Sequence, residues 1–228
     1  MHQVGRNARR HLDAARERVA RILGCTPREI VFTGSGSEAA AIAVLGAFRA
    51  RKDKTKRRIV TTTIEHPCVL GAVKVLEAEG AEVIRVAPGA DGAVPLQALL
   101  DVLSDSTALC SVQWVNNETG VIQPAAAVAR ACVERKIIFH SDAVQAFGRI
   151  PASLREVPAD LLSLSAHKLG GLFGGVHLRD HEALRPRLER ADEVVMPPAH
   201  DAGHGVHASE PGGPHEVLAL DPAGEAEN

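Results

Sequence analysis

A lysine that could act as a nucleophile lies just after a short apolar stretch. Residues 161–165 have the pattern of a buried strand, and His167, Lys168, Gly170 and Gly171 follow it. A lysine at the end of a buried strand is expected to be desolvated, which lowers the pKa of its amine. A neutral lysine amine can form an imine with a carbonyl group. The segment therefore predicts a reactive amine at Lys168.

A carboxylate occupies a similar place on the preceding apolar segment. Residues 137–140 form a short apolar run, and Asp142 lies just past it. There the carboxylate could pair with a protonated ring nitrogen, or it could simply cap a helix. A lysine imine together with a carboxylate partner for a pyridinium ring is typical of enzymes that use pyridoxal phosphate.

A third candidate is the glycine-rich turn Thr33-Gly34-Ser35-Gly36-Ser37-Glu38. A turn of this kind that enters a helix offers free backbone N–H groups and the positive end of the helix dipole, which suit a phosphate. The alternative is an ordinary flexible turn with Ser37 as the N-cap. The turn matches neither the dinucleotide-binding pattern nor the P-loop pattern, so it indicates a phosphate site only in combination with Asp142 and Lys168.

The surrounding elements alternate between strands and helices. An amphipathic helix is predicted over residues 3–23, with Gly24 as its C-cap. Strands are predicted at residues 30–33, 59–63, 82–86, 108–115, 137–140 and 161–165. Helices are predicted at residues 38–50, 68–79, 96–103 and 125–134. This order predicts an α/β domain with a mostly parallel sheet flanked by helices, in which ligands bind beyond the carboxyl ends of the strands.

Composition narrows the functional class. The chain has 228 residues, of which 45% are hydrophobic, and a net charge of −2, which gives no reason to expect nucleic acid or an anionic membrane as a partner. The N-terminus lacks an apolar signal core, so a cytoplasmic location is expected. The four cysteines form no C-x-x-C pair, and the histidines after residue 199 have no regular ligand spacing, so no metal site is predicted.

Two segments differ from the rest in composition. Residues 49–58 carry seven Lys or Arg, which indicates a solvated connection more than a binding patch. Residues 191–228 contain no Lys or Arg, eight Asp or Glu, and ten Pro or Gly. We therefore expect a cofactor-binding domain over residues 1–190 and a disordered acidic tail over residues 191–228.

Five motifs together resemble those of cysteine desulfurases, which belong to the class V aminotransferase branch of the fold-type I pyridoxal phosphate enzymes. The motifs are Phe32-Thr33 through Glu38, Glu65-His66-Pro67, VNNETGVIQP at 115–124, DAVQ at 142–145 and SAHK at 165–168. The resemblance extends over residues 2–190. It implies that pyridoxal 5'-phosphate is the cofactor.

The resemblance also implies nine cofactor-binding residues: Gly36, Ser37, His66, Asn117, Asp142, Gln145, Ser165, His167 and Lys168. Lys168 and His66 are implied to be catalytic, with Lys168 bonded to the cofactor and His66 stacked on its ring. Asp142 is implied to keep the ring nitrogen protonated. The remaining positions are implied to hold the phenolic oxygen, at Asn117 and Gln145, or the phosphate, at Gly36, Ser37, Ser165 and His167.

The family reaction that the resemblance implies converts L-cysteine to L-alanine and passes the sulfur on as an enzyme persulfide. The implied partners are a second copy of the chain and a sulfur-acceptor or scaffold protein, for iron–sulfur cluster assembly or thio-modification. A selenocysteine lyase or another class V aminotransferase is an alternative, although VNNETG favours the desulfurase. A non-catalytic cofactor-binding remnant is a further alternative.

The sequence also departs from the family pattern. Lys168 is followed by Leu-Gly-Gly, where the family has Gly-Pro. The family's small C-terminal domain, its substrate-binding arginine and its persulfide-forming cysteine would come later, yet no cysteine follows Cys132. An incomplete chain is therefore expected, whose own activity is uncertain. For Cys68, a small buried residue at a helix start is favoured over a thiol near the cofactor.

Overall fold

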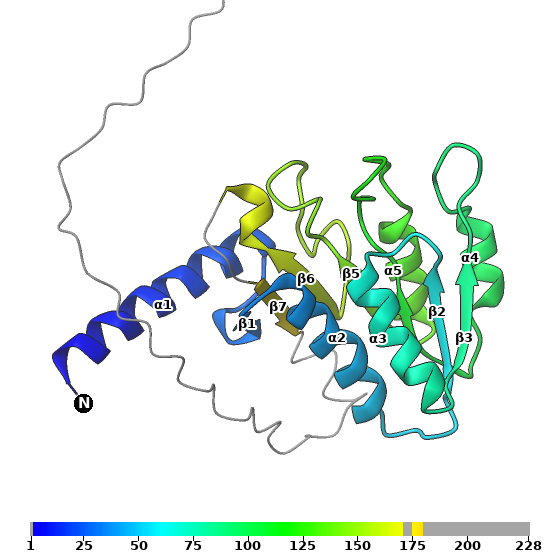
Figure 1. The fold of residues 1–228 in the computed structure, drawn as a ribbon, viewed down its shortest axis with the longest axis horizontal. Helices are drawn as coiled ribbons and strands as arrows, with labels where there is room; N and C mark the ends of the chain where they lie inside the picture. The colour runs from blue at the N-terminus through cyan, green and yellow to red at the C-terminus, as the bar shows by residue number, and fades with distance from the viewer. Residues whose placement is uncertain (1, 171–174, 180–228) are drawn as a thin grey trace, which may run out of the picture. The chain divides into compact units, whose positions relative to one another are not determined.

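The computed structural model describes residues 2–170 and 175–179, which form a seven-stranded sheet with helices on both faces (Figure 1). In chain order the strands are β1 Ile30–Thr33, β2 Arg58–Thr62, β3 Glu82–Val86, β4 Thr107–Ser111, β5 Ile138–Asp142, β6 Leu161–Ser165 and β7 Gly175–Arg179. The spatial order is β1-β7-β6-β5-β4-β2-β3. Strand β7 is antiparallel to both of its neighbours, β1 and β6, and all other strand pairs are parallel, so the predicted α/β class with a mostly parallel sheet is confirmed.

The helices are α1 Gln3–Leu23, α2 Gly36–Ala50, α3 Pro67–Ala78, α4 Leu96–Val102 and α5 Ala125–Glu134, with 3₁₀ turns η1 Pro27–Glu29 and η2 Ala166–Leu169. Two hydrophobic cores lie on opposite faces of the sheet. Helices α2 and α3 contribute to one core, and α1, α4 and α5 to the other. Side chains alternate between the two along each strand, as Ile59 and Val60 do on β2.

Most predicted boundaries match the structure. The helices at 3–23 and 125–134 and the strands at 82–86 and 161–165 are confirmed to the residue, and Gly24 caps α1 with a φ of 77°. The strand predicted at 108–115 is too long, because β4 ends at Ser111. The backbone stays extended beyond it, since the Trp114 N–H still donates to the Asp142 carbonyl at 2.9 Å. Strand β7 was not predicted.

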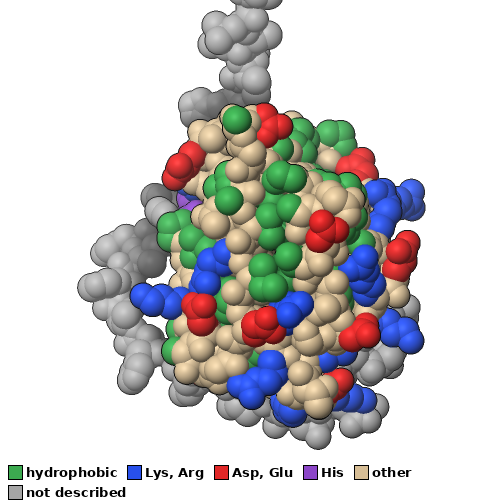
Figure 2. All heavy atoms as spheres, turned by 90° about the vertical axis from the view of Figure 1, so that its right-hand side faces the viewer, with side chains coloured by type: hydrophobic (Ala, Val, Ile, Leu, Met, Phe, Trp, Pro, Cys, Tyr) green, Lys and Arg blue, Asp and Glu red, His purple; other side chains and the backbone are tan. Residues whose placement is uncertain are grey.

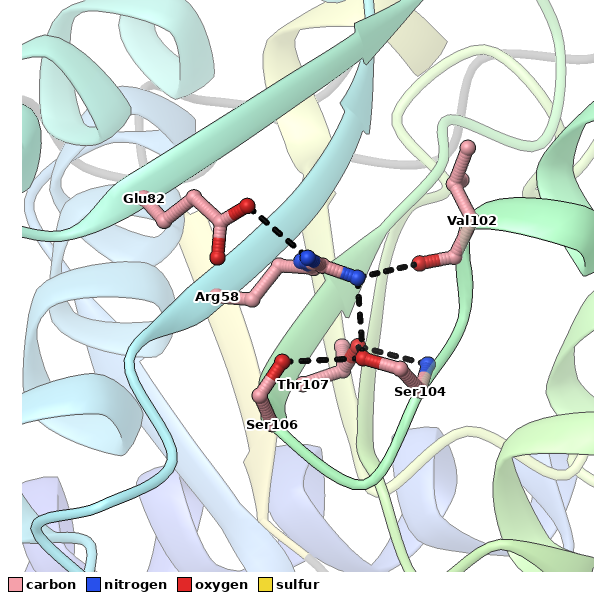
Figure 3. Close-up of polar contacts among 6 residues, drawn as sticks. All are labelled: Arg58, Glu82, Val102, Ser104, Ser106 and Thr107. Atoms are coloured by element: carbon pink, nitrogen blue, oxygen red, sulfur yellow. Dashed lines mark hydrogen bonds and ion pairs between the residues drawn. The ribbon is translucent and has the colours of Figure 1, made fainter.

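Charged residues organise the amino ends of β2 and β3, the end of the sheet remote from the predicted site. Figure 3 shows Arg58 reaching from β2 to Glu82 on β3, to the Val102 carbonyl and to Ser104. The edge strand β3 carries a second ion pair, from Arg85 to Glu77 at 2.6 Å. Figure 2 looks onto the side of the molecule where β3 and α4 lie, and charged side chains there flank a strip of hydrophobic ones. Charges on an edge strand oppose pairing with another chain.

Among the described residues, no helix is both long and apolar enough to span a membrane. The same part of the chain holds no cluster of three or more His, Cys, Asp or Glu residues arranged for a metal ion. The predicted acidic tail at 191–228 lies outside the described residues.

Candidate active site

The glycine-rich turn delivers the start of α2 to the carboxyl end of β6. The N-cap is Ser35, whose Oγ accepts the Glu38 N–H at 3.1 Å, so the alternative that Ser37 caps the helix is wrong. Ser35 and Glu38 have the spacing of a capping box, a signal that favours Ser35 as the cap. At Gly36 an added Cβ would lie only 3.0 Å from the Ser165 Cβ. Glycine at this position therefore lets the unpaired N–H groups of the helix start approach β6 closely.

A cavity of about 260 Å³ opens at the carboxyl ends of the strands, beside this helix start. All nine residues predicted to bind the cofactor line it: Gly36, Ser37, His66, Asn117, Asp142, Gln145, Ser165, His167 and Lys168. The structure thus brings together residues from five separate segments of the chain. Five lining residues were not among those nine: Ser35, Cys68, Gln113, Val115 and Val144.

Asp142 is the buried acid of the cavity. It is the last residue of β5 rather than the first beyond it, and 8% of it is exposed. Burial raises the pKa of Asp142, while a hydrogen bond from the Val144 N–H and the proximity of His66 oppose that rise. Its Oδ1 accepts the Val144 N–H at 3.0 Å, so it serves as a local cap and a cavity wall at once. A cationic group in the cavity would stabilise its ionised form.

Lys168 lies on η2, directly after β6, and it lines the cavity from an exposed position. The expectation that this lysine is buried is wrong for the described residues, because the residues of η2 are exposed although those of β6 are buried. The turn itself is held in place, since Arg149 Nη2 donates to the Lys168 carbonyl at 2.8 Å. On the same turn, Ser165 Oγ lies 2.7 Å from His167 Nδ1.

His66 and Cys68 form a contact at the start of α3. His66 is the N-cap, and its Nδ1 accepts the Cys68 N–H at 3.2 Å and lies 2.9 Å from the Cys68 Sγ. Burial and the nearby Asp142 raise the pKa of the Cys68 thiol to about 11. Cys68 is therefore a neutral thiol near neutral pH. As predicted, Cys68 lies at the start of a helix. It is only half-buried, however, and it lines the cavity.

Glu65 is a functional candidate to which the sequence alone assigned no role. Its Oε1 accepts the Thr62 hydroxyl at 2.7 Å and the Gln113 N–H at 2.9 Å. It thereby ties the turn before His66 to the segment after β4. The available signal was an acid three residues after Thr62 and directly before His66, in a segment that connects a strand to a helix.

Comparison with known proteins decides the family. Residues 1–188 match the sequence profile described as Aminotransferase class-V. The chain belongs to the class V aminotransferase family. It is 38% identical over 202 residues to the cysteine desulfurase IscS of Histophilus somni. The aligned region covers 89% of this chain and 49% of that relative. The chain thus spans about half the length of the curated relatives it matches.

Solved structures agree with this assignment. DndA from Streptomyces lividans superposes with a TM-score of 0.75 at 34% identity, over 81% of this chain and 52% of that one. A structure described as SspA in complex with cysteine superposes with a TM-score of 0.74 at 34% identity, over 78% of this chain and 52% of that one. The resemblance to cysteine desulfurases is confirmed by these matches.

Enzymes of this family use pyridoxal phosphate, and the cavity has the chemistry to hold that group. The α2 start, Ser37 and Ser165 supply donors for a phosphate. The buried Asp142, which lines the same cavity, suits a protonated ring nitrogen. The close approach of Gly36 to Ser165 leaves no room for a side chain there, as a phosphate-binding turn requires. The residues present therefore fit the cofactor.

Proposed function

We propose that this chain binds pyridoxal 5'-phosphate through Lys168 and takes part in removing sulfur from L-cysteine. The observation that carries the proposal is the convergence of nine separately predicted residues on one cavity. Lys168 is the one lysine among the described residues that line it. The description of one matched structure names cysteine as the molecule bound by that protein, which supports the same substrate class here.

The bound cofactor would supply an electron sink for the amino acid substrate. The residues of this chain would do the rest. Asp142 would hold a proton on the ring nitrogen through its carboxylate, and the imidazole of His66 would lie against the ring face. The amine of Lys168, once free of the cofactor, would accept the proton from the substrate Cα. Asn117 and Gln145 would orient the ring through its phenolic oxygen.

The net reaction that we propose converts L-cysteine to L-alanine while the sulfur atom joins a thiolate as a persulfide. Cys68 is poorly suited to accept it, because its raised pKa keeps the thiol neutral. We therefore propose that another cysteine thiolate is brought to the cavity. A sulfur-acceptor or scaffold protein would be the final recipient, for iron–sulfur cluster assembly or thio-modification, and the working form would be a cytoplasmic homodimer.

The test of cofactor attachment uses the full chain with added pyridoxal phosphate. We expect a visible absorption band and, after borohydride reduction, a mass label on the peptide that contains Lys168. Lys168→Ala should abolish both. Lys74→Ala is the matched control, since Lys74 is exposed on α3 and does not line the cavity. A label on any other lysine of the wild-type chain would contradict the assignment.

The test of activity measures alanine formed from L-cysteine in the presence of the cofactor and a thiol acceptor. Alanine formation that Lys168→Ala abolishes would support a desulfurase. Alanine formed from L-selenocysteine alone would favour the selenocysteine lyase alternative. Amino transfer to an oxo acid without sulfur release would favour an aminotransferase. Cofactor attachment with no turnover in any assay would favour the non-catalytic alternative.

A further inference from the structure

Glu65 is a buried acid that none of the nine cofactor-binding assignments uses. It lies between β2 and α3, and only 4% of it is exposed. Two hydrogen bonds reach its carboxyl group, from the Thr62 hydroxyl and from the Gln113 backbone N–H, and Oε1 accepts both. Its Oε2 is buried and has no hydrogen-bond partner among the described residues. A buried polar atom without a partner destabilises a folded protein, so Glu65 is a site that calls for an explanation.

The titratable groups around Glu65 in the described part of the chain include no lysine or arginine. They are Asp142 at the end of β5, Cys110 on β4, the neighbouring His66, and Glu118, which borders a second cavity of about 340 Å³ together with Glu65. Burial raises the pKa of Glu65 to about 8, and Asp142 adds to the rise, while the two hydrogen bonds oppose it. Near neutral pH the side chain is therefore mostly a neutral acid.

The neutral acid lies where it can hold two walls of the cavity. Its bond to Thr62 closes the turn that leads into His66, and its bond to the Gln113 N–H fixes the segment after β4. His66 and Gln113 both line the cavity. Gln113 Nε2 also donates to the Ile64 carbonyl at 2.6 Å, which ties the same two segments together a second time.

We propose that Glu65 is a positioning residue that holds His66 and Gln113 in place as a neutral acid, and that its ionisation weakens cofactor binding. This inference rests on the proposed function, since it concerns the same cavity. Ionised Glu65 would place a second negative charge near Asp142. Two close carboxylates disfavour each other's ionisation, so the ionised form of Asp142, the form that would pair with the ring nitrogen, would be less populated. Pyridoxal phosphate also carries a net negative charge, which a further buried anion would repel.

The first experiment measures the dissociation constant of pyridoxal phosphate for the full chain at pH 7 and pH 9. For the wild type we expect about tenfold weaker binding at pH 9, as follows if the ionised form of an acid with a pKa of about 8 does not bind. Glu65→Gln keeps an oxygen that can accept both hydrogen bonds but cannot ionise, so the dependence due to Glu65 should vanish. Glu65→Ala should bind weakly at both pH values. Glu118→Gln, an exposed control, should follow the wild type.

Equal pH dependence in the wild type and in Glu65→Gln would overturn the inference while leaving the proposed function intact. Failure of the wild type to bind the cofactor at either pH would overturn both the cofactor role of Glu65 and the proposed function.

A second experiment, thermal unfolding without cofactor, tests the neutral acid alone. The folded pKa is raised, so the unfolded chain loses the Glu65 proton first as the pH rises. Wild-type stability should therefore fall relative to Glu65→Gln between about pH 4.5 and pH 8 and then level off. Melting curves that keep a constant separation over this range would show that Glu65 is not held neutral, and would also overturn the inference.

Discussion

The two ends of the sheet place charged side chains in opposite ways. At the carboxyl ends of the strands, Asp142 and Glu65 are buried without a lysine or arginine partner among the described residues, and burial raises the pKa of both. At the amino ends, Arg58 bonds to Glu82 at 2.8 Å and to Ser104 at 2.9 Å. Burial of these carboxyls reduces stability, and the carboxylate of Asp142 is left to pair with a ligand in the cavity, whereas the paired arginine holds strands together. A buried acid without an ion-pair partner therefore distinguishes the site from the scaffold.

Two buried aspartates, one at each end of the sheet, show the same difference between site and scaffold. Asp142 ends β5, and Asp160 lies just before β6, at the opposite end of the sheet. Asp160 Oδ2 accepts the Phe139 N–H at 2.8 Å, and the Asp160 N–H donates back to the Phe139 carbonyl at 3.0 Å. Its bonds therefore join the beginnings of two strands. The bond of Asp142 to Val144 is local, and the rest of its carboxyl faces the cavity.

The largest effect is expected from replacing these two aspartates by asparagine, one at a time. Asp142→Asn removes the charge that would hold a protonated ring nitrogen, so cofactor affinity should fall by about a hundredfold or more. Asp160→Asn should leave affinity unchanged and lower the free energy of unfolding by about 1–2 kcal/mol. Cofactor titration and chemical denaturation measure the two quantities.

The pH dependence of stability gives a second test of the role of Asp142. The folded pKa of Asp142 is raised above its ordinary value of 3.8, so ionisation of Asp142 destabilises the fold as the pH rises above that value. Asp142→Asn should therefore melt at a higher temperature than the wild type at neutral pH, with no gain below about pH 4. A loss of stability at neutral pH would show that Asp142 belongs to the scaffold.

A smaller effect, on stability alone, is expected at Arg58. Arg58→Met removes the bonds to Glu82, Ser104 and the Val102 carbonyl, and should lower the free energy of unfolding by about 1–3 kcal/mol. Arg57→Met is the control, because within the described part of the chain the exposed Arg57 side chain makes a single hydrogen bond, to the Gly80 carbonyl. That variant should lose less than about 1 kcal/mol. If Arg58→Met changed cofactor affinity more than the control did, the amino ends of the strands would contribute to the site as well as to stability.

Two glycines of α2 test how tightly the site end is built. Gly36→Ala would place a Cβ 3.0 Å from the Ser165 Cβ, so the helix start and β6 must separate by a few tenths of an ångström. Such a shift should weaken cofactor binding by about tenfold, as misplaced binding groups do. Gly46→Ala meets nothing within 4 Å and should stabilise the helix by up to about 1 kcal/mol. Equal affinity in the two variants would show that the close approach of Gly36 is not needed.

Local sequence patterns predicted most of the helices and strands, and the errors in that prediction have local causes. Strand β6 was predicted to the residue because apolar residues and small hydroxyls fill it completely. The strand at 108–115 was predicted too long because the extended backbone continues through Trp114, although the ladder of β4 has ended. Strand β7 follows a glycine-rich segment, where hydrophobic periodicity gives no warning that the chain turns back into the sheet.

The site was predicted from the order of the motifs along the chain, which carries no information on how buried each residue is. All nine residues line the cavity, since each follows a strand or begins a helix at the same edge of the sheet. The environment of Lys168 was misjudged, because burial of a strand says nothing about the turn that follows it. Glu65 was overlooked for a related reason. Its role depends on bonds to Thr62 and Gln113, and Gln113 lies 48 positions further along the chain.

The smallest effect is expected at Cys68, which lies at the site but should not serve its chemistry. With a pKa of about 11 its thiol is almost entirely protonated at pH 7.5, and only the thiolate takes up sulfur. Cys68→Ala removes the contact with the His66 imidazole, so cofactor affinity should change by less than about threefold. Alanine formation from L-cysteine should change as little. Cys25→Ala, a half-buried cysteine outside the cavity, is the matched control. A hundredfold loss of alanine formation in Cys68→Ala alone, with cofactor binding intact, would identify Cys68 as the sulfur acceptor. Activity would then rise with pH toward the thiol pKa, as the reactive thiolate accumulates.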